Sequence, residues 1–460
     1  MVTLDRGMGL LQATATNIIG MVGVGPFLTI PFMVKAMGGP HIIYAWAFGA
    51  LLALCDGLVY AELGAALPGS GGPYVYLREA YRPFGLGPLM AFVFIFQVML
   101  VAPLAIAGGA VGFADYLGFY WPTMTPRQHN IIAAAVCAAV TALLYRDIRS
   151  IGRLAVVMLV VALGTLGWVI GSGLVHFSWA QAFDFPPAAR RLDAGLLRAM
   201  GAAGLLAMYN YGGYNNVCNI GEEIRAPERT LPRAIVLSIA AVVVLYVVMS
   251  TVILGMVPWQ EAQQTRTIAS LFIARTFANP ADGHVAALVM TGLILFITAS
   301  SLYAVVLGYS RVPFAAARDG QFFPQFARLH PTKHFPHVSL LTIGAVTIPF
   351  CFFSLGQLVN WLIQVQILLQ FVWQCAAVIL LRRYRPDIRK PFRMWLYPLP
   401  ALVSMAMWIY IFVSAPLVGV IFSIAFFATA IAAYFVFDRT RARNRTSPPA
   451  ASRADRQAFP

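Results

Sequence analysis

Recurring apolar stretches of about the same length are the feature that most constrains how this chain can fold. Each runs to roughly 20 residues, and an α-helix of that length crosses about 30 Å of hydrocarbon. Because backbone N–H and C=O groups find no partners in lipid, stretches that cross a bilayer are expected to be helical. Twelve can be placed, at residues 10–37, 41–66, 86–114, 129–145, 153–175, 199–221, 232–257, 284–310, 338–356, 358–381, 396–414 and 416–437.

The composition supports a membrane protein. Of the 460 residues, 60% are hydrophobic and only 11% are charged, a balance that the surface of a soluble domain does not show. The sequence therefore predicts an all-α membrane protein with twelve transmembrane helices. All five cysteines fall inside expected spans, which argues against a disulfide framework. No cleavable signal peptide is expected, since the first span is long and lacks a small-residue cleavage site.

The formal net charge of +15 follows the expected topology. With the N-terminus placed in the cytoplasm, most of the 32 Lys and Arg residues fall in cytoplasmic segments, as the positive-inside rule requires. We therefore interpret the charge as topological and expect no nucleic-acid partner. The Pro, Ser and Arg content of residues 438–460 predicts a basic, disordered cytoplasmic tail near anionic headgroups. The expected location is the plasma or inner cell membrane, with both termini cytoplasmic.

Two expected spans are interrupted at mid-depth by glycines beside polar residues. The first span carries GMVGVGP at 20–26, and the sixth carries YNYGGYNNVCN at 209–219. They take position one in each consecutive group of five spans, a pattern that indicates inverted repeats, 10–175 and 199–381, around a midplane site. Interrupted backbone is costly in lipid, so it must line a cavity or be buried in protein. The alternative is that the glycines only permit close helix packing.

Four longer motifs carry a family resemblance. They are YAELGAALPGSGGPYVYLREAYRPFG (60–85), NIGEEIRAPERTLPRAI (219–235), SRVPFAAARDGQFFPQF (310–326) and RRYRPDIRKPFRMWLYPLP (382–400). With them the chain resembles the amino acid, polyamine and organocation (APC) transporter superfamily over nearly its whole length. The sixth span is most similar to bacterial relatives of the heteromeric amino acid exchanger light chains.

The resemblance implies a bacterial leucine transporter-like fold. This is a five-plus-five inverted repeat with broken helices 1 and 6, and it works by alternating access. The transporter domain would cover residues 1–437, with two extra helices in 396–437.

The resemblance also implies how the substrate carboxylate is held. Residues 23–27 match a glycine-rich segment whose backbone amides bind it at the start of a half-helix, where the helix dipole favours an anion. Here Val24 replaces a small hydroxyl residue, and Pro26 has no N–H to donate. The amides of Val24, Gly25 and Phe27 remain as donors.

The substrate ammonium group is expected on the carbonyl side of both interruptions. Carbonyls freed by unwinding, at 17–20 and at Tyr209 and Asn210, would accept its hydrogen bonds. By resemblance Tyr209 matches an aromatic gate, while Tyr214 and Asn215 match positions beside the site; the alternative role is packing. The expected substrate-binding residues are Ile19, Gly20, Gly23, Val24, Gly25, Tyr209, Asn210, Gly212, Gly213, Tyr214 and Asn215.

Asp56, in the second span, is the most unusual side chain. An ionisable residue inside the membrane is expensive and is a functional candidate by default. Plant polyamine uptake transporters, which the chain also resembles, show an acid at this spacing and a GPF after their glycines. One hypothesis is that Asp56 binds a cation or titrates a proton. The other is that it only forms hydrogen bonds beside an interrupted helix.

Ion coupling has further candidates. Proton-coupled bacterial relatives place a lysine in the fifth span, but residues 154–175 contain none. Sodium-coupled members of the wider fold use hydroxyls of the eighth span, which makes Thr298, Ser300 and Ser301 candidates. The alternative is that these hydroxyls bond to their own helix backbone. A coupling proton or sodium ion is thus an expected partner.

We predict a secondary active transporter of amino acids or related amines. The alternatives are a polyamine-selective cation symporter and, from other classes, a non-transporting amino acid sensor or a channel. An enzyme is not expected, since there is no metal-ligand spacing and no nucleotide-binding loop, and neither a catalytic residue nor a cofactor nor a metal is predicted. Exchanger light chains carry a linking cysteine after the third span. Residues 117–127 have none, so no covalent heavy-chain partner is expected.

Overall fold

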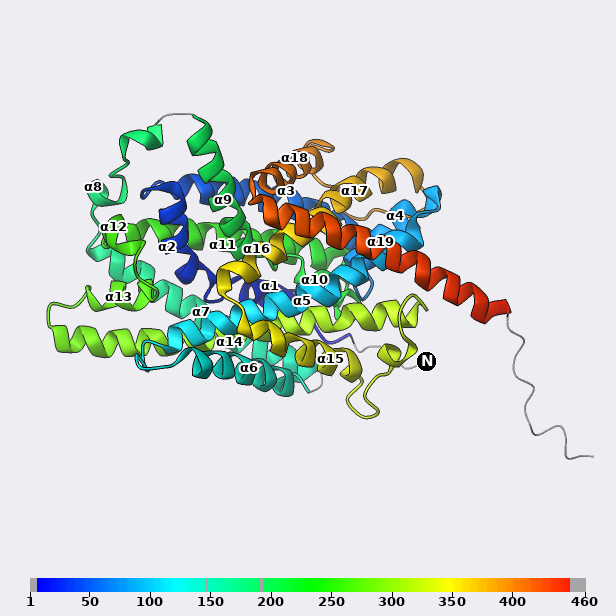
Figure 1. Ribbon diagram of the computed structural model, residues 1–460, viewed down its shortest axis with the longest axis horizontal. Helices are drawn as coiled ribbons and strands as arrows, with labels where there is room; N and C mark the ends of the chain where they lie inside the picture. The colour runs from blue at the N-terminus through cyan, green and yellow to red at the C-terminus, as the bar shows by residue number, and fades with distance from the viewer. Residues whose placement is uncertain (1–5, 146–147, 191–192, 447–460) are drawn as a thin grey trace, which may run out of the picture.

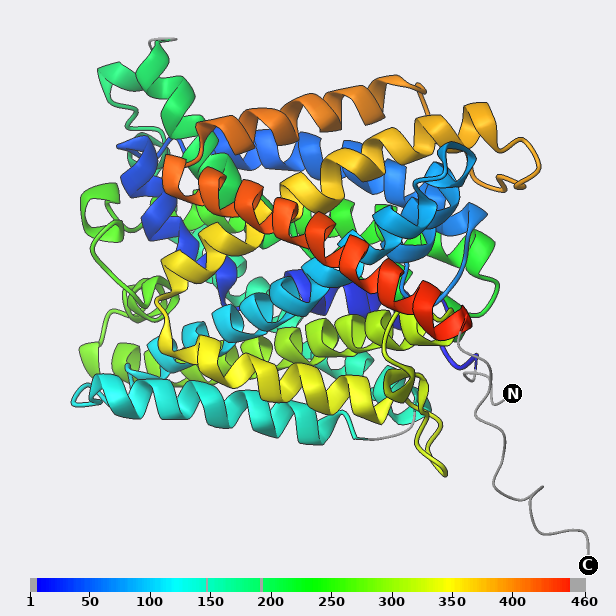
Figure 2. The same cartoon turned by 45° about the vertical axis from the view of Figure 1, so that its right-hand side comes forward.

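The computed structural model describes residues 6–145, 148–190 and 193–446. Within them the chain forms a bundle of helices, most of which run along one direction of the molecule (Figure 1). The start of α1 and the last turns of α19 lie at the same end of this bundle, which we call the termini end (Figure 2). Two isolated β-bridges, Met8 with Ile224 and Ser70 with Ile220, join loops there.

The helices up to residue 190 are given in chain order. They are α1 (Leu10–Met21), α2 (Gly25–Met37), α3 (Ile43–Ala66), α4 (Pro73–Tyr81), η1 (Arg82–Phe84), α5 (Gly87–Leu117), α6 (Pro126–Leu143), α7 (Ile148–Val175), α8 (Trp179–Ala182) and η2 (Pro187–Arg190). Helix α3 packs against α9 (Ala194–Tyr211), α11 (Pro227–Leu254) and α18 (Leu399–Ser414). Helix α1 packs against α7, α11 and α14 (Pro280–Arg318).

The remaining helices follow. They are α9 (Ala194–Tyr211), α10 (Asn216–Asn219), η3 (Gly221–Glu223), α11 (Pro227–Leu254), α12 (Trp259–Ala262), α13 (Ile268–Ala274), α14 (Pro280–Arg318), η4 (Pro324–Ala327), α15 (His337–Thr347), η5 (Ile348–Phe352), α16 (Leu355–Gln366), η6 (Ile367–Phe371), α17 (Val372–Tyr384), α18 (Leu399–Ser414) and α19 (Leu417–Thr446). Helix α19 thus continues beyond residue 437 into the predicted tail, of which residues 447–460 lie outside the described part.

Membrane-spanning helices are confirmed as the basis of the fold. Among the described residues, seven helices are long and apolar enough to cross a bilayer, and α1 with α2 makes an eighth if the bent pair is one span. Helices α6, α9, α15 and α18 do not pass this test of length and hydropathy. The helices that pass the test are enough to make the chain a multi-pass membrane protein. The predicted total of twelve spans would be reached only if α6, α9, α15 and α18 also crossed the membrane.

The regular α-helical backbone is bent or interrupted at three places inside the bundle. Helices α1 and α2 are bent by 42° across residues 22–24. Helix α9 ends at Tyr211, and the chain turns through residues 212–215 before α10 begins. Helices α16 and α17 are joined by a π-helical turn, η6, and single π turns occur frequently at functional sites. Pro26, in the first turn of α2, suits a helix start because its missing N–H would have no intrahelical acceptor there.

Candidate functional site

The two glycine-rich interruptions lie against each other. Gly213 has φ +115°, and a Cβ at this position would lie 3.0 Å from the carbonyl carbon of Gly20. Only glycine combines that backbone conformation with so close an approach. Asn17 fixes the same contact from the other side: its Nδ2 donates to the Tyr214 carbonyl at 2.6 Å, and its Oδ1 accepts from the Val217 amide at 3.0 Å. The interruptions therefore form one structural unit.

A cavity of about 130 Å³ lies between this unit and helices α5, α14, α16, η6 and α18. This volume is many times the roughly 10–15 Å³ that one water needs, so the cavity can hold a small solute. Most of the predicted site residues line it: Gly20, Gly23, Val24, Gly25, Tyr209, Asn210, Gly212, Gly213, Tyr214, Asn215, Thr298 and Ser301. Ile19, Asp56 and Ser300 are not among the lining residues.

Other lining side chains were not among the predicted binding residues. They include Asn216, Asn219, Tyr309, Phe371 and Trp408, and also Gln366 and Gln370, for which the sequence allowed either interhelical hydrogen bonding or lining of the path. The two glutamines are four residues apart on one helix face, a spacing that was visible in the sequence. Trp408 gave no such signal, because one aromatic residue in an apolar helix is typical of packing. Its place in the wall follows only from the fold.

Two asparagine side chains at the cavity hold unused acceptors. Asn210 donates through Nδ2 to Thr29 Oγ1 and to the Leu206 carbonyl, both at 2.7 Å. Its buried Oδ1 accepts no hydrogen bond among the described residues, and the same is true of Asn219 Oδ1. A buried acceptor without a partner costs about 1–3 kcal/mol. A ligand that donates N–H groups would recover this free energy.

The three hydroxyl candidates of α14 differ in their partners. Thr298 donates to the Ile294 carbonyl at 2.7 Å, and Ser300 donates to the Phe296 carbonyl at 2.8 Å. Both therefore bond back to their own helix. Ser301 instead donates to the carbonyl of Gly20 at 3.2 Å, so it joins α14 to the first interruption.

Asp56 lies behind the cavity wall. Its Oδ2 accepts a short hydrogen bond from Tyr214, while Oδ1 accepts from Ser404 at 3.1 Å and from the Trp408 indole at 3.4 Å. The thiol sulfur of Cys375 lies 3.6 Å from Oδ1. Asp56 thus joins α3 to the second interruption, α17 and α18, and both of its oxygens are occupied by protein donors.

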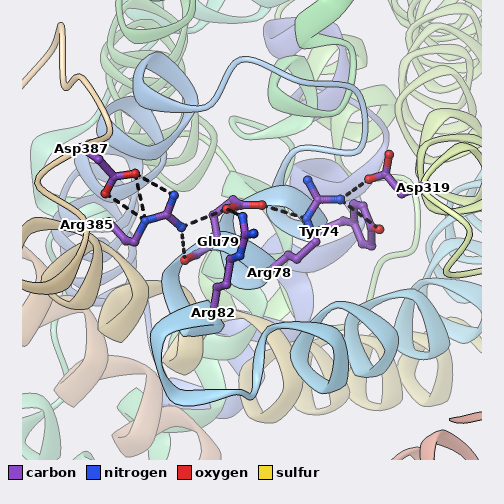
Figure 3. Close-up of polar contacts among 7 residues, drawn as sticks. All are labelled: Tyr74, Arg78, Glu79, Arg82, Asp319, Arg385 and Asp387. Carbon is purple, nitrogen blue, oxygen red and sulfur yellow. Dashed lines mark hydrogen bonds and ion pairs between the residues drawn. The ribbon is translucent and has the colours of Figure 1, made fainter.

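Charged side chains gather around α4 and the end of α17, which lie on the same side of the molecule as the end of α19 (Figure 1). Figure 3 shows their contacts. Arg78 on α4 pairs with Asp319 after α14, and its Nε lies 3.0 Å from Glu79. Arg385, after α17, reaches Glu79 at 3.0 Å and Asp387 at 2.9 Å. Burial opposes the charged form of Glu79, but the hydrogen bonds from Arg385 and Arg78 outweigh it and lower the pKa of this carboxyl. We call these five residues the ion network.

Two further pairs lie deeper at this end. Arg311 on α14 holds Glu223 of η3 through contacts of 2.8 and 3.3 Å, and both side chains are buried. Arg382 on α17 holds Glu62 of α3 through two contacts of 2.6 Å. The Met394 amide also donates to Glu62 at 2.8 Å. Each pair fastens segments far apart in the sequence.

The helices and the cavity define a multi-pass membrane protein with an internal site for a small molecule. The chain belongs to the amino acid permease family, within the APC superfamily, because a model of that family matches residues 8–443. The predicted resemblance is therefore confirmed. Members of this family move small molecules across membranes without catalysing a reaction, and the chain is accordingly a transporter and not an enzyme.

Similar proteins are named for different substrates. The chain is 26% identical to a methylthioribose transporter of Bacillus subtilis, over 95% of this chain and 94% of that protein. It is 25% identical to a branched-chain amino acid permease of the same organism, over 96% and 95%. It is 26% identical to the human cystine/glutamate transporter, over 88% and 79%. These similarities support amino acid transport but leave the particular substrate to the chemistry of the cavity.

Proposed function

We propose that this protein is a secondary active transporter that carries amino acids by alternating access around the cavity. The observation that carries the proposal is the contact of the two interruptions, Gly213 against Gly20, at a cavity that both of them line. Interrupted helices at a midplane site expose backbone groups that can bind both ends of a zwitterion. Contact between the two makes it possible for one ligand to bind both.

Each end of the substrate has a proposed partner. The carboxylate would bind the amides at the start of α2, at Val24, Gly25 and Phe27, where a helix N-terminus attracts an anion. The ammonium group would donate to the carbonyls at the end of α1 and to Asn210 Oδ1, which has no partner among the described residues. Tyr209, which also lines the cavity, would cover the bound substrate.

We further propose the predicted topology of twelve spans. It requires α6, α9, α15 and α18 to cross the membrane beside the eight spans counted above. Residues 10–175 and 199–381 then form the inverted repeats, and the termini end faces the cytoplasm of a cell membrane. For coupling to a sodium ion, Ser301 and Thr298 are the proposed residues. Both line the cavity, and Ser301 contacts the Gly20 carbonyl.

Counterflow in proteoliposomes tests this function. Vesicles loaded with an unlabelled amino acid should take up the same labelled amino acid faster than empty vesicles do, and the uptake should saturate. A thermal-shift screen of amino acids and polyamines at two pH values would first select the ligand. Stabilisation without accelerated exchange would indicate a sensor, and voltage-driven flux without saturation would indicate a channel.

A further inference from the structure

The cavity has polar walls but no ionised side chain among the described residues that line it. Its polar groups are backbone, amides and hydroxyls, such as those of Asn219, Tyr309, Gln366 and Gln370, and the rest of its lining is apolar. The two interruptions offer backbone groups to an amino group and a carboxylate. A third charge on the substrate would be buried without a partner of opposite sign, which is costly in a membrane interior.

One carboxylate lies directly behind this wall. Asp56 is 0% exposed, and two of the side chains that occupy its oxygens, Tyr214 and Trp408, themselves line the cavity. The Trp408 ring is stacked on Phe371 with centroids 4.2 Å apart and an interplanar angle of 8°. Tyr60 meets Tyr214 edge-on at 6.0 Å. The screen between Asp56 and the cavity is thus an aromatic layer whose members hold one another in place.

We propose that the cavity selects amino acids whose side chains carry no charge, and that Tyr214 enforces this by keeping Asp56 out of the substrate's reach. The proposal rests on the amino acid transport proposed above and names its substrate class. Arginine, glutamate and diamines each bring a charge that nothing in the wall neutralises. If the ring of Tyr214 were absent, the Asp56 carboxylate would face the cavity and attract a cationic group.

The first test is a counterflow panel on the wild-type protein with labelled leucine, serine, arginine, glutamate and putrescine. Leucine or serine should exchange at least about tenfold faster than each of the three charged probes, because a buried charge without a partner is strongly disfavoured. Exchange of arginine, glutamate or putrescine at the rate of the neutral amino acids would overturn the proposed selectivity. If none of the five exchanges, amino acid transport itself fails, and the inference with it.

The second test removes part of the aromatic layer between Asp56 and the cavity. Tyr214→Ser should raise the exchange rates of arginine and putrescine, relative to that of the better neutral amino acid, by about tenfold or more. It should not raise the exchange rate of glutamate. Adding Asp56→Asn should abolish the gain. Tyr214→Phe is the matched control, because it removes the hydroxyl but keeps the ring between Asp56 and the cavity, and no gain is expected.

Folding of each variant is checked by its elution profile and by thermal stabilisation with leucine or serine. A folded Tyr214→Ser protein without the gain would overturn the role of Tyr214, and so would a gain that survives Asp56→Asn. If Tyr214→Ser does not fold, Trp408→Leu opens the same layer from α18 and carries the same expectation. The wild-type panel tests the selectivity whatever the variants do.

Discussion

The centre of the molecule and its termini end use polar groups in opposite ways. At the termini end, arginines and carboxylates pair with each other across α4, α14, η3 and the segment after α17. In the cavity, no charged side chain lines the wall among the described residues, and acceptors such as Asn210 Oδ1 have no protein partner. Polar groups that are satisfied within the protein hold its helices together, while those without a partner are available to a ligand.

This contrast separates residues that should affect folding from residues that should affect transport. A buried ion pair fixes one arrangement of its helices, because parting the two charges in a low-dielectric interior is expensive. Groups around the cavity contribute little to folding by this route. Variants at the termini end should therefore change stability first, and variants at the interruptions should change exchange first.

The largest expected effect is a loss of stability when the buried pair of Arg311 with Glu223 is broken. Arg311→Ala would leave Glu223 as an uncompensated buried charge, which typically destabilises a protein by about 3–5 kcal/mol. The thermal unfolding midpoint in detergent should fall sharply. Arg275→Ala is the matched control, because its pair with Glu261 is 2.6 Å long but exposed, and exposed pairs contribute about 0–1 kcal/mol.

A double variant sharpens this prediction. Arg311→Met combined with Glu223→Leu removes both charges and fills their space with apolar groups, a change that is often close to neutral. Most of the lost stability should return. An Arg311→Ala protein as stable as Arg275→Ala would show that the buried pair does not fasten α14 to η3.

The second effect concerns exchange at the interruptions. Gly213→Ala places a Cβ 3.0 Å from the Gly20 carbonyl carbon, at a φ of +115° that other residues rarely adopt. Strain of this kind costs about 1–3 kcal/mol, and the interruptions must move apart to relieve it. Counterflow should fall roughly tenfold, the factor that corresponds to 1.4 kcal/mol. Gly164→Ala in α7 is the control, since its added Cβ meets nothing within 4 Å; equal losses in the two variants would contradict a special role for Gly213.

How much of this was predictable depends on whether a signal is local. The glycine-rich stretches were visible in the sequence, because glycines inside apolar runs weaken helices wherever they occur. The structure has a 42° bend at the first of them and a turn over residues 212–215 at the second. Ser300 and Ser301 show the limit. They are neighbours in the chain, but one residue of an α-helix turns the side chain by about 100°. Only Ser301 therefore reaches the Gly20 carbonyl. The sequence does not show which of the two side chains faces the first interruption, because that depends on how α14 is rotated against α1.

Contacts between distant helices were out of reach for the same reason. Asp56 was recognised as unusual, but its partners Tyr214, Ser404 and Trp408 come from positions 158, 348 and 352 residues further along the chain. Their meeting depends on how α3 packs against α18 and against the turn that follows α9, which no local pattern encodes. The number of spans cannot be read from hydropathy alone either, because α15 and α18 are apolar but shorter than the helices that pass the test of length.

The smallest expected effect is a pH dependence of the ion network. The pKa of Glu79 is lowered in the folded protein below its ordinary value of 4.5. The charged form therefore adds stability that is complete above about pH 4.5 and is lost as the pH falls through the lowered value. The wild type should unfold at a higher midpoint temperature than Glu79→Gln, and this difference should stay constant from neutral pH to about pH 5 and become smaller below that. Because the network is partly exposed, the corresponding difference in the free energy of unfolding should not exceed about 1 kcal/mol.

The control is Glu261→Gln, in an exposed pair, whose unfolding midpoint should lie closer to that of the wild type. If the difference in midpoint between the wild type and Glu79→Gln were still the same at pH 3, the charge of Glu79 would not stabilise the termini end through its pairs with Arg78 and Arg385.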